Sequence, residues 1–114
     1  MFEQLVWKDR KVSLKDMVFR LDPPRPFPDY GNRELCLVKE RRMIEQYATH
    51  WRDCPRWGGN LLELGIYDGG SIAFWNELLN PAKHVAIDAA DWGDSIAYQE
   101  YVIARNITDQ IKTY

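Results

Sequence analysis

Residues 61–71 read Leu-Leu-Glu-Leu-Gly-Ile-Tyr-Asp-Gly-Gly-Ser, and this stretch decides the fold. Residues 60–64 are apolar apart from Asn60 and Glu63, which is typical of a short buried strand. Glycines at positions 65, 69 and 70 then mark a turn, because glycine adopts backbone angles that other residues avoid. Residues 71–79 have a helical pattern that Asn80 and Pro81 would end. The stretch therefore predicts a strand, a glycine-rich turn and a helix in direct succession.

The chain beyond this turn continues the alternation of strands and helices. Residues 84–87 form a second apolar segment that ends at Asp88, and residues 96–105 carry apolar side chains at helical spacing. Residues 111–114 begin a third strand. Such alternation indicates parallel strands joined by right-handed crossovers. We expect an α/β fold with the order strand, helix, strand, helix, strand over residues 58–114.

The region before it, residues 1–57, is expected to be an arm followed by helical structure. A short helix is predicted over 13–19, with Ser13 as its cap. Four prolines between positions 23 and 28 exclude helix and paired strand there. Apolar side chains three or four apart predict a long helix over 33–53, which Asn32 can cap and Pro55 stops. The chain thus divides into an N-terminal helical region and the α/β segment.

The composition limits the kinds of molecule and the cellular surroundings expected for this chain. The 114 residues suffice for one domain, and 46% hydrophobic with 28% charged residues is the balance of a folded globular protein. The net charge is -2, and the basic run over 39–42 alternates with glutamate, so no footprint for nucleic acid is present. No apolar run is long enough for a signal core or a membrane span. Cys36 and Cys54 lack metal-site spacing, so we expect two reduced thiols in a cytoplasmic protein, unless the fold brings them together as a disulfide.

The glycine turn and Asp88 together predict a ligand site. Gly65 lets the backbone leave the strand sharply and lets a ligand lie against it. Gly69 and Gly70 bring the next helix close to the sheet, and its N-terminus suits a carboxylate. Asp88 ends a strand at the edge where parallel sheets bind ligands, and it can accept hydrogen bonds from both ribose hydroxyls. Each feature alone could be a tight connection or a helix cap; their combination and order favour an adenosine-type cofactor.

Two side chains indicate which adenosine-type cofactor the site would bind. A dinucleotide fingerprint has the form G-x-G-x-x-G, and Tyr67 stands where its second glycine would let a pyrophosphate approach. Glu63 is an acidic residue in an apolar strand, and a buried carboxylate needs a partner. The ammonium of a methionyl group, direct or through water, would supply that partner. The residues therefore favour an S-adenosyl compound over a nicotinamide dinucleotide.

Residues 63–71 resemble the first motif of class I S-adenosylmethionine-dependent methyltransferases. The form E-[IVL]-G-[IV]-Y-x-G-G-S resembles that of the cephalosporin hydroxylase and macrolide-sugar O-methyltransferase group. Residues 85–88, Val-Ala-Ile-Asp, resemble the second motif. The resemblance covers residues 61–114 and implies the N-terminal portion of a Rossmann-like methyltransferase fold.

The resemblance also implies roles by position. The cofactor, S-adenosylmethionine, would contact the glycine turn through its methionyl part, Glu63 through its amino group and Asp88 through its ribose. Ser71 would meet the cofactor carboxylate, although helix capping alone would explain it. Asp91 and Trp92 would lie near the adenine, although Trp92 suits the core equally well. The predicted cofactor-binding residues are Glu63, Gly65, Tyr67, Asp68, Gly69, Gly70, Ser71, Asp88, Asp91 and Trp92.

The resembled fold places its acceptor pocket and any acid, base or metal ligand after the third strand. We therefore expect a truncated chain, inactive alone, with no assignable catalytic residue and no metal ligand. His50 and His84 are expected to have structural or surface roles. A half sheet leaves an unpaired edge and uncovered apolar surface, so the chain should be marginally stable or form a homo-oligomer.

Three functions follow, in decreasing order of support. The first is methyl transfer to a small-molecule acceptor, with oxygen as the favoured target and this chain supplying the cofactor-binding half. The second is a non-catalytic module that binds an adenosyl ligand or mediates an interaction. The third is a nicotinamide-dependent oxidoreductase, which Tyr67 disfavours.

Overall fold

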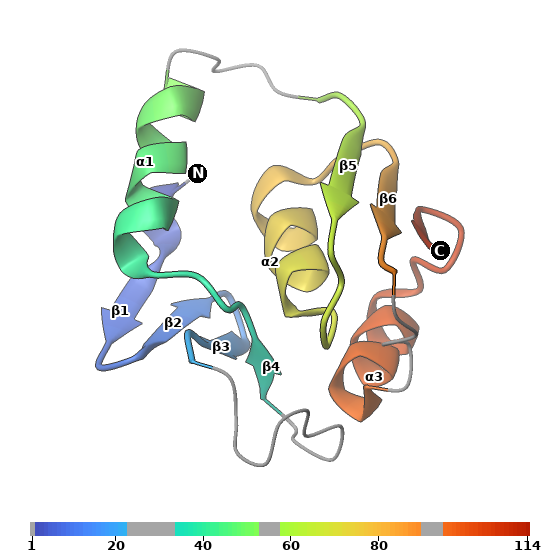
Figure 1. The fold of residues 1–114 in the computed structure, drawn as a ribbon, viewed down its shortest axis with the longest axis horizontal. Coiled ribbons are helices and arrows are strands. Elements are labelled where there is room, and N and C mark those ends of the chain that lie inside the picture. Colours follow the sequence, from blue (N-terminus) through green and yellow to red (C-terminus); the bar gives the residue numbers. More distant parts are fainter. Residues whose placement is uncertain (1, 23–33, 53–57, 90–94) are drawn as a thin grey trace.

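A computed structural model describes residues 2–22, 34–52, 58–89 and 95–114. Its helices and strands form an antiparallel-rich N-terminal half and a parallel C-terminal half (Figure 1). In chain order they are the 3-10 helix η1 (Phe2–Gln4), β1 (Val6–Lys8), β2 (Lys11–Leu14), β3 (Met17–Arg20), β4 (Leu35–Cys36), α1 (Arg41–Arg52), β5 (Leu61–Leu64), α2 (Gly70–Leu79), β6 (His84–Ile87), α3 (Ile96–Arg105) and β7 (Ile111–Thr113).

The C-terminal half has the predicted α/β order. β5, β6 and β7 lie side by side in that order, and both pairings are parallel. α2 connects the first two strands and α3 connects the last two. The predicted alternation of strands and helices is therefore confirmed, with β6 and α3 at the expected residues and the others within one residue of them.

Local signals explain where these helices begin and end. The Ser95 hydroxyl accepts a hydrogen bond from the Tyr98 N–H and so caps the start of α3. Asn80 and Asn106 follow α2 and α3 in the left-handed conformation, with φ of 48° and 52°. Asparagine tolerates this conformation better than most residues, which makes it a common helix stop. These boundaries depend on neighbouring residues only, so the sequence pattern located them well.

The helix predicted over residues 13–19 is wrong. This segment lies in an antiparallel hairpin, in which Ser13 on β2 pairs with Val18 on β3. Val12, Leu14 and Phe19 are buried, whereas Ser13 and Val18 between them are not. That alternation has a period of two residues, which is the period of a strand with one buried face. The short apolar run fitted both periods, and packing against the rest of the chain selected the strand.

The long helix predicted over 33–53 is shorter than expected, because α1 begins only at Arg41. Leu35 and Cys36 instead form β4, which runs parallel to β3. Leu35, Cys36 and Leu37 are all buried, so this segment has no exposed face of the kind that an amphipathic helix shows. The expected cap Asn32 and stop Pro55 lie outside the described residues.

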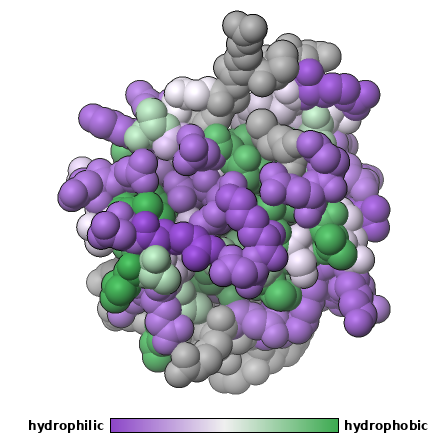
Figure 2. Space-filling view, turned by 180° about the vertical axis from the view of Figure 1, so that it is seen from behind, coloured by the Kyte–Doolittle hydropathy of each residue, from purple (hydrophilic) through white to green (hydrophobic). Residues whose placement is uncertain are grey.

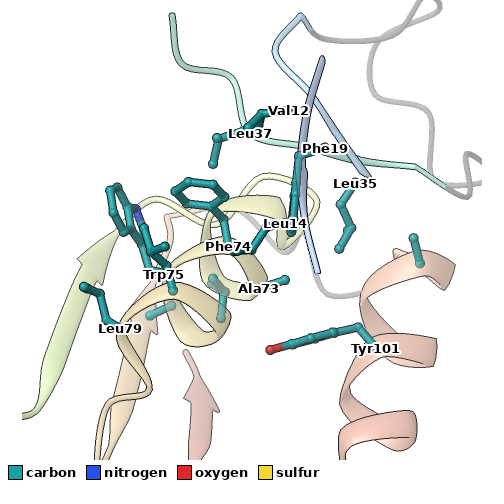
Figure 3. Packing of buried hydrophobic residues seen from close by; sticks show 14 of the residues in the cluster. Val12, Leu14, Phe19, Leu35, Leu37, Ala73, Phe74, Trp75, Leu79 and Tyr101 are labelled. Carbon is teal, nitrogen blue, oxygen red and sulfur yellow. The ribbon is translucent and has the colours of Figure 1, made fainter. Parts of the chain in front are cut away.

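α2 forms the centre of the molecule, between the antiparallel sheet and the parallel sheet (Figure 1). Its residues are apolar on nearly all sides, and seven of its ten are buried. Phe74 of α2 packs edge-to-face against Phe19 of β3 with ring centroids 5.5 Å apart, and Leu14 and Leu37 lie beside them (Figure 3). One hydrophobic cluster therefore includes residues from both sides of residue 57. The division of the chain into two regions at that residue stays a prediction.

The far face of the parallel sheet is uncovered in the described part of the chain. Leu62, Leu64 and Ile87 are 60%, 81% and 43% exposed. Leu64 pairs with Ile87, so the two side chains share a face. The expected apolar surface on the half sheet is thus present. On the side shown in Figure 2, apolar side chains reach the surface in separate places among hydrophilic ones.

None of the described helices combines the length and the apolar character that a membrane crossing requires.

Candidate functional site

The glycine turn and Asp88 lie at the same end of the parallel sheet. Gly65 follows β5, and its N–H donates to the carbonyl oxygen of Ile87 at 2.7 Å. Asp88 follows β6, and its Oδ2 accepts hydrogen bonds from the N–H groups of Ile66 at 2.7 Å and Tyr67 at 3.4 Å. The Asp88 N–H donates to the carbonyl of Tyr114 at 2.9 Å, which continues the pairing with the third strand. The predicted juxtaposition of bend and carboxylate is therefore present.

Gly65 leaves space beside the bend. Its φ is +99°, a left-handed value that favours glycine, and a Cβ built there would meet no atom of the described residues within 4 Å, apart from its own chain neighbours. Tyr67 also has a positive φ of 54°, so the turn stays tightly wound over three residues. The surface of the turn at Gly65 is accordingly open to a ligand rather than filled by protein.

Gly69 and Gly70 have a different role from Gly65. A Cβ at Gly69 would come within about 2.5 Å of the Tyr98 ring on α3, and a Cβ at Gly70 would overlap the backbone carbonyl of Cys36. These two glycines therefore let the start of α2 approach α3 and β4. The sequence predicted that these glycines bring α2 close to the parallel sheet. In the structure they bring it close to α3 and to β4 of the other sheet.

Asp68 is a buried carboxylate that joins two backbone segments. Its Oδ2 accepts from the Cys36 N–H at 2.8 Å, and its Oδ1 accepts from the Gly70 N–H at 2.9 Å. Burial raises the pKa of Asp68, and the backbone N–H donors oppose this increase. Asp68 thus caps the start of α2 and ties β4 to the turn, which leaves the Gly70 N–H already satisfied.

Glu63 has partners within the protein. Its Oε1 lies 2.7 Å from Nε2 of His84, and its Oε2 accepts a hydrogen bond from the Ser71 hydroxyl at 2.7 Å. His84 is fully buried, whereas the Glu63 side chain keeps 12% of its surface exposed. The expectation that this carboxylate needs a partner is confirmed for His84 and Ser71; a ligand partner remains a prediction.

A cavity of about 420 Å³ lies between the glycine turn and the segment that leaves β4. Volumes of roughly 300–1,000 Å³ are typical of small-molecule sites. The cavity is lined by Cys36, Leu37, Val38, Lys39, Glu63, Leu64, Gly65, Ile66, Tyr67, Ser71 and Asp88. A neighbouring cavity of about 250 Å³ shares Lys39, Glu63, Leu64 and Ser71 with it and continues toward Tyr47, Trp51 and Trp75.

Five of the predicted cofactor-binding residues therefore surround one space: Glu63, Gly65, Tyr67, Ser71 and Asp88. Asp68, Gly69 and Gly70 hold the turn in place and are not among the lining residues. Asp91 and Trp92 lie outside the described residues. Residues 36–39 were missed, because nothing in their pattern relates them to a turn thirty residues later.

Cys36 and Lys39 add chemistry to the wall. Burial raises the pKa of the Cys36 thiol to about 11, so it stays protonated at neutral pH and is a poor nucleophile. Lys39 adds a cation to the cavity wall that also includes Glu63 and Asp88. Across the described residues, no three His, Cys, Asp or Glu side chains gather as a metal site would require. The arrangement suits a small ligand with both cationic and hydroxyl groups.

Known proteins provide little guidance beyond this geometry. No protein-family model matches the sequence, and no curated protein matches it. Among solved structures, the X-ray structure of YjhP from E. coli is similar with a TM-score of 0.41 and 18% identity. The similarity covers 61% of this chain and 28% of YjhP, so the chain spans less than a third of that protein. A similarity this low carries no argument about function.

Proposed function

We propose that this chain binds S-adenosylmethionine in the 420 Å³ cavity and serves methyl transfer to an oxygen of a small-molecule acceptor. One observation carries the proposal: the Gly65 bend and the Asp88 carboxylate flank a single cavity at the carboxyl edge of two adjacent parallel strands. Open parallel sheets bind nucleotide-type ligands at this edge. The resemblance of residues 63–71 and 85–88 to methyltransferase motifs supports the same ligand.

The space at Gly65 fits the approach of such a ligand. Among the described residues other than Gly65 and its two chain neighbours, no atom lies within 4 Å of the position that a Cβ would take, so a ligand can lie directly against the backbone. When bound, S-adenosylmethionine would supply an electrophilic methyl group on a sulfonium. The protein's part is then to hold that group in line with an acceptor, since methyl transfer depends mainly on positioning.

Asp88 is proposed to bind the ribose hydroxyls. Its carboxylate already accepts two backbone N–H groups of the turn, which holds it rigidly at the cavity wall. A carboxylate offers about four acceptor positions, and a ribose presents two neighbouring hydroxyl donors. A carboxylate that the turn holds in place is preorganised for hydroxyl donors.

The methionyl end is proposed to lie between Glu63 and Lys39. Both side chains line the cavity, one as an anion and one as a cation. An amino acid group carries the complementary pair of charges. Since Asp68 already accepts from the Gly70 N–H at the start of α2, Lys39 is the better partner for the ligand carboxylate.

Tyr67 argues against a dinucleotide in this cavity. Its half-buried side chain lines the space beside Gly65, where the fingerprint of dinucleotide-binding proteins has a glycine. A pyrophosphate must contact the backbone at that point. We therefore expect NAD to bind much more weakly than an S-adenosyl compound.

A non-catalytic adenosyl-binding module is the second candidate. The two carboxylates on the cavity wall already have contacts within the protein: Glu63 contacts His84 and Ser71, and Asp88 holds the turn. The Cys36 thiol is protonated because burial raises its pKa. None of these three is poised as a general base for an acceptor hydroxyl. Binding of S-adenosylmethionine without product formation, over a range of hydroxylated acceptors, would favour this candidate.

The test is calorimetric titration of the chain with S-adenosylhomocysteine and, separately, with NAD. We expect binding of the first only. Asp88→Ala should weaken that binding by about 1–3 kcal/mol, or roughly 5- to 150-fold, because it removes hydrogen bonds to the ribose. Asp88→Asn, which keeps an acceptor for the turn, should lose less, and exposed Asp109→Ala should change nothing. Unchanged affinity in Asp88→Ala would remove Asp88 from the site.

A further inference from the structure

We infer that His84 and Ser71 form a clamp that orients the Glu63 carboxylate toward a ligand ammonium group; the inference rests on the proposed function and assigns a positioning role to both residues. The clamp consists of two contacts of 2.7 Å, one to each carboxylate oxygen of Glu63. Its members come from β5, β6 and the first turn of α2.

The topology of the sheet creates the clamp. His84 is paired with Leu61 on the neighbouring strand, and Glu63 is two residues further along that strand. Side chains two residues apart in a strand share a face, so His84 and Glu63 are diagonal neighbours on the side of the sheet that α2 covers. Ser71 approaches the second oxygen from the start of α2, which the glycine turn brings back over the strand.

The burial of the three side chains shows which way the Glu63 carboxylate faces. His84 is fully buried behind the carboxylate, whereas Glu63 and Ser71 line both the 420 Å³ and the 250 Å³ cavities. The carboxylate therefore faces the cavities while His84 supports it from the interior. Each carboxylate oxygen has two acceptor positions, so one contact on each leaves capacity for a ligand donor.

The tautomer of His84 follows from the contacts of its two ring nitrogens. Nδ1 of His84 is buried and has no hydrogen-bond partner among the described residues. The tautomer with its proton on Nε2 donates to the Glu63 carboxylate and leaves Nδ1 as an acceptor. The Glu63 carboxylate thus accepts from both partners and keeps acceptor positions for a ligand ammonium.

This arrangement selects a primary ammonium beside an adenosyl group, the amino acid end of the proposed cofactor. A carboxylate held by two hydrogen bonds loses less conformational freedom when the ligand arrives. The clamp should therefore strengthen binding of ligands that have the ammonium and leave other ligands unaffected. That selectivity separates positioning from a purely structural role.

The experiment compares S-adenosylhomocysteine with 5′-methylthioadenosine, which has the same adenosine and sulfur but lacks the amino acid group. Dissociation constants are measured by calorimetry for the unmodified chain, His84→Leu, His84→Gln and Ser71→Ala. We expect His84→Leu to weaken S-adenosylhomocysteine binding at least about tenfold, the effect of losing a hydrogen bond to a charged group, and to leave 5′-methylthioadenosine binding within about twofold. His84→Gln keeps an N–H donor and should restore much of the loss.

Matched controls keep the outcomes separate. His50→Leu makes the same substitution at an exposed histidine on α1 and should change neither ligand. If His84→Leu does not fold, Ser71→Ala tests the other half of the clamp at a half-buried position and should show the same selectivity at smaller size. Equal losses for both ligands would overturn the clamp and leave the proposed function standing. Binding of neither ligand by the unmodified chain would overturn the proposed function and the clamp together.

Discussion

At the scale of single residues, the three glycines of one motif have two different physical roles. Gly65 faces open space, whereas Gly69 faces Tyr98 and Gly70 faces the backbone of Cys36. In the first case glycine provides an unusual backbone angle and a surface for a ligand. In the other two it allows elements to pack closely. A sequence motif alone treats these positions alike, and only the neighbours of each Cα separate them.

Gly65→Ala tests the role of that bend. We expect a loss of about 1–2 kcal/mol in the free energy of unfolding, because alanine is strained at a φ of +99°. We also expect weaker S-adenosylhomocysteine binding, because the methyl group would project into the ligand space. Urea denaturation and calorimetry measure the two effects. Gly58→Ala, at another glycine with open surroundings and no positive φ, is the control and should change neither.

At the scale of elements, one charged cluster joins the N-terminal hairpin to both helices of the parallel half. Glu77 on α2 accepts from Lys15 at 2.9 Å and from Arg105 at 2.7 Å, and Arg105 also contacts Asp16 at 2.7 Å. Burial alone would raise the pKa of Glu77, but the hydrogen bonds from Lys15 and Arg105 outweigh it, so the pKa is lowered. Lys15 and Asp16 form the turn between β2 and β3, so the cluster fixes this hairpin against α2 and α3.

Glu77→Gln should therefore destabilise the fold in a pH-dependent way. Because the pKa of Glu77 is lower in the folded chain than in the unfolded chain, its contribution is present above the ordinary glutamate range and is lost as pH falls through the folded value. We expect a loss of about 1–3 kcal/mol at neutral pH from urea denaturation. The difference from the unmodified chain should shrink as the pH falls below the ordinary glutamate range.

Glu45→Gln provides the comparison, because Glu45 pairs with Arg41 on the surface of α1 with more than half of its side chain exposed. Surface pairs contribute only about 0–1 kcal/mol. A loss for Glu77→Gln no greater than that for Glu45→Gln would show that the cluster does not hold the hairpin.

At the scale of the whole molecule, the uncovered face of the parallel sheet is the main departure from a closed core. Leu62, Leu64 and Ile87 project from it, and Leu64 is the most exposed of them. Exposed apolar side chains gathered on one face are characteristic of interaction surfaces or of a tendency to aggregate. We expect the chain to self-associate as its concentration rises, which size-exclusion chromatography with light scattering would detect.

Leu64→Lys should reduce that association, because it places a charge in the middle of the apolar face. Ile103→Lys is a matched control: Ile103 on α3 is similarly exposed but lies away from the sheet face. Equal effects of the two substitutions would indicate a general effect of charge. A monomer at every concentration in the unmodified chain would contradict the expectation itself.

The parts of this protein that the sequence alone determined are those with local causes. The bend at Gly65, the helix stop at Asn80 and the apolar strand before Asp88 each depend on a few neighbouring residues. Parallel pairing of β5 and β6 then brings the bend and the carboxylate to one edge, so five of the site residues could be predicted to lie together.

Tertiary structure decided what depends on distant partners. The hairpin over 11–20 and the strand at Leu35 fitted helical spacing equally well, and packing against α2 selected their extended forms. The same packing placed residues 36–39 on the cavity wall and joined His84 to Glu63. Burial by residues far away in the chain outweighs weak local propensity, and no local pattern encodes which distant surface will supply that burial.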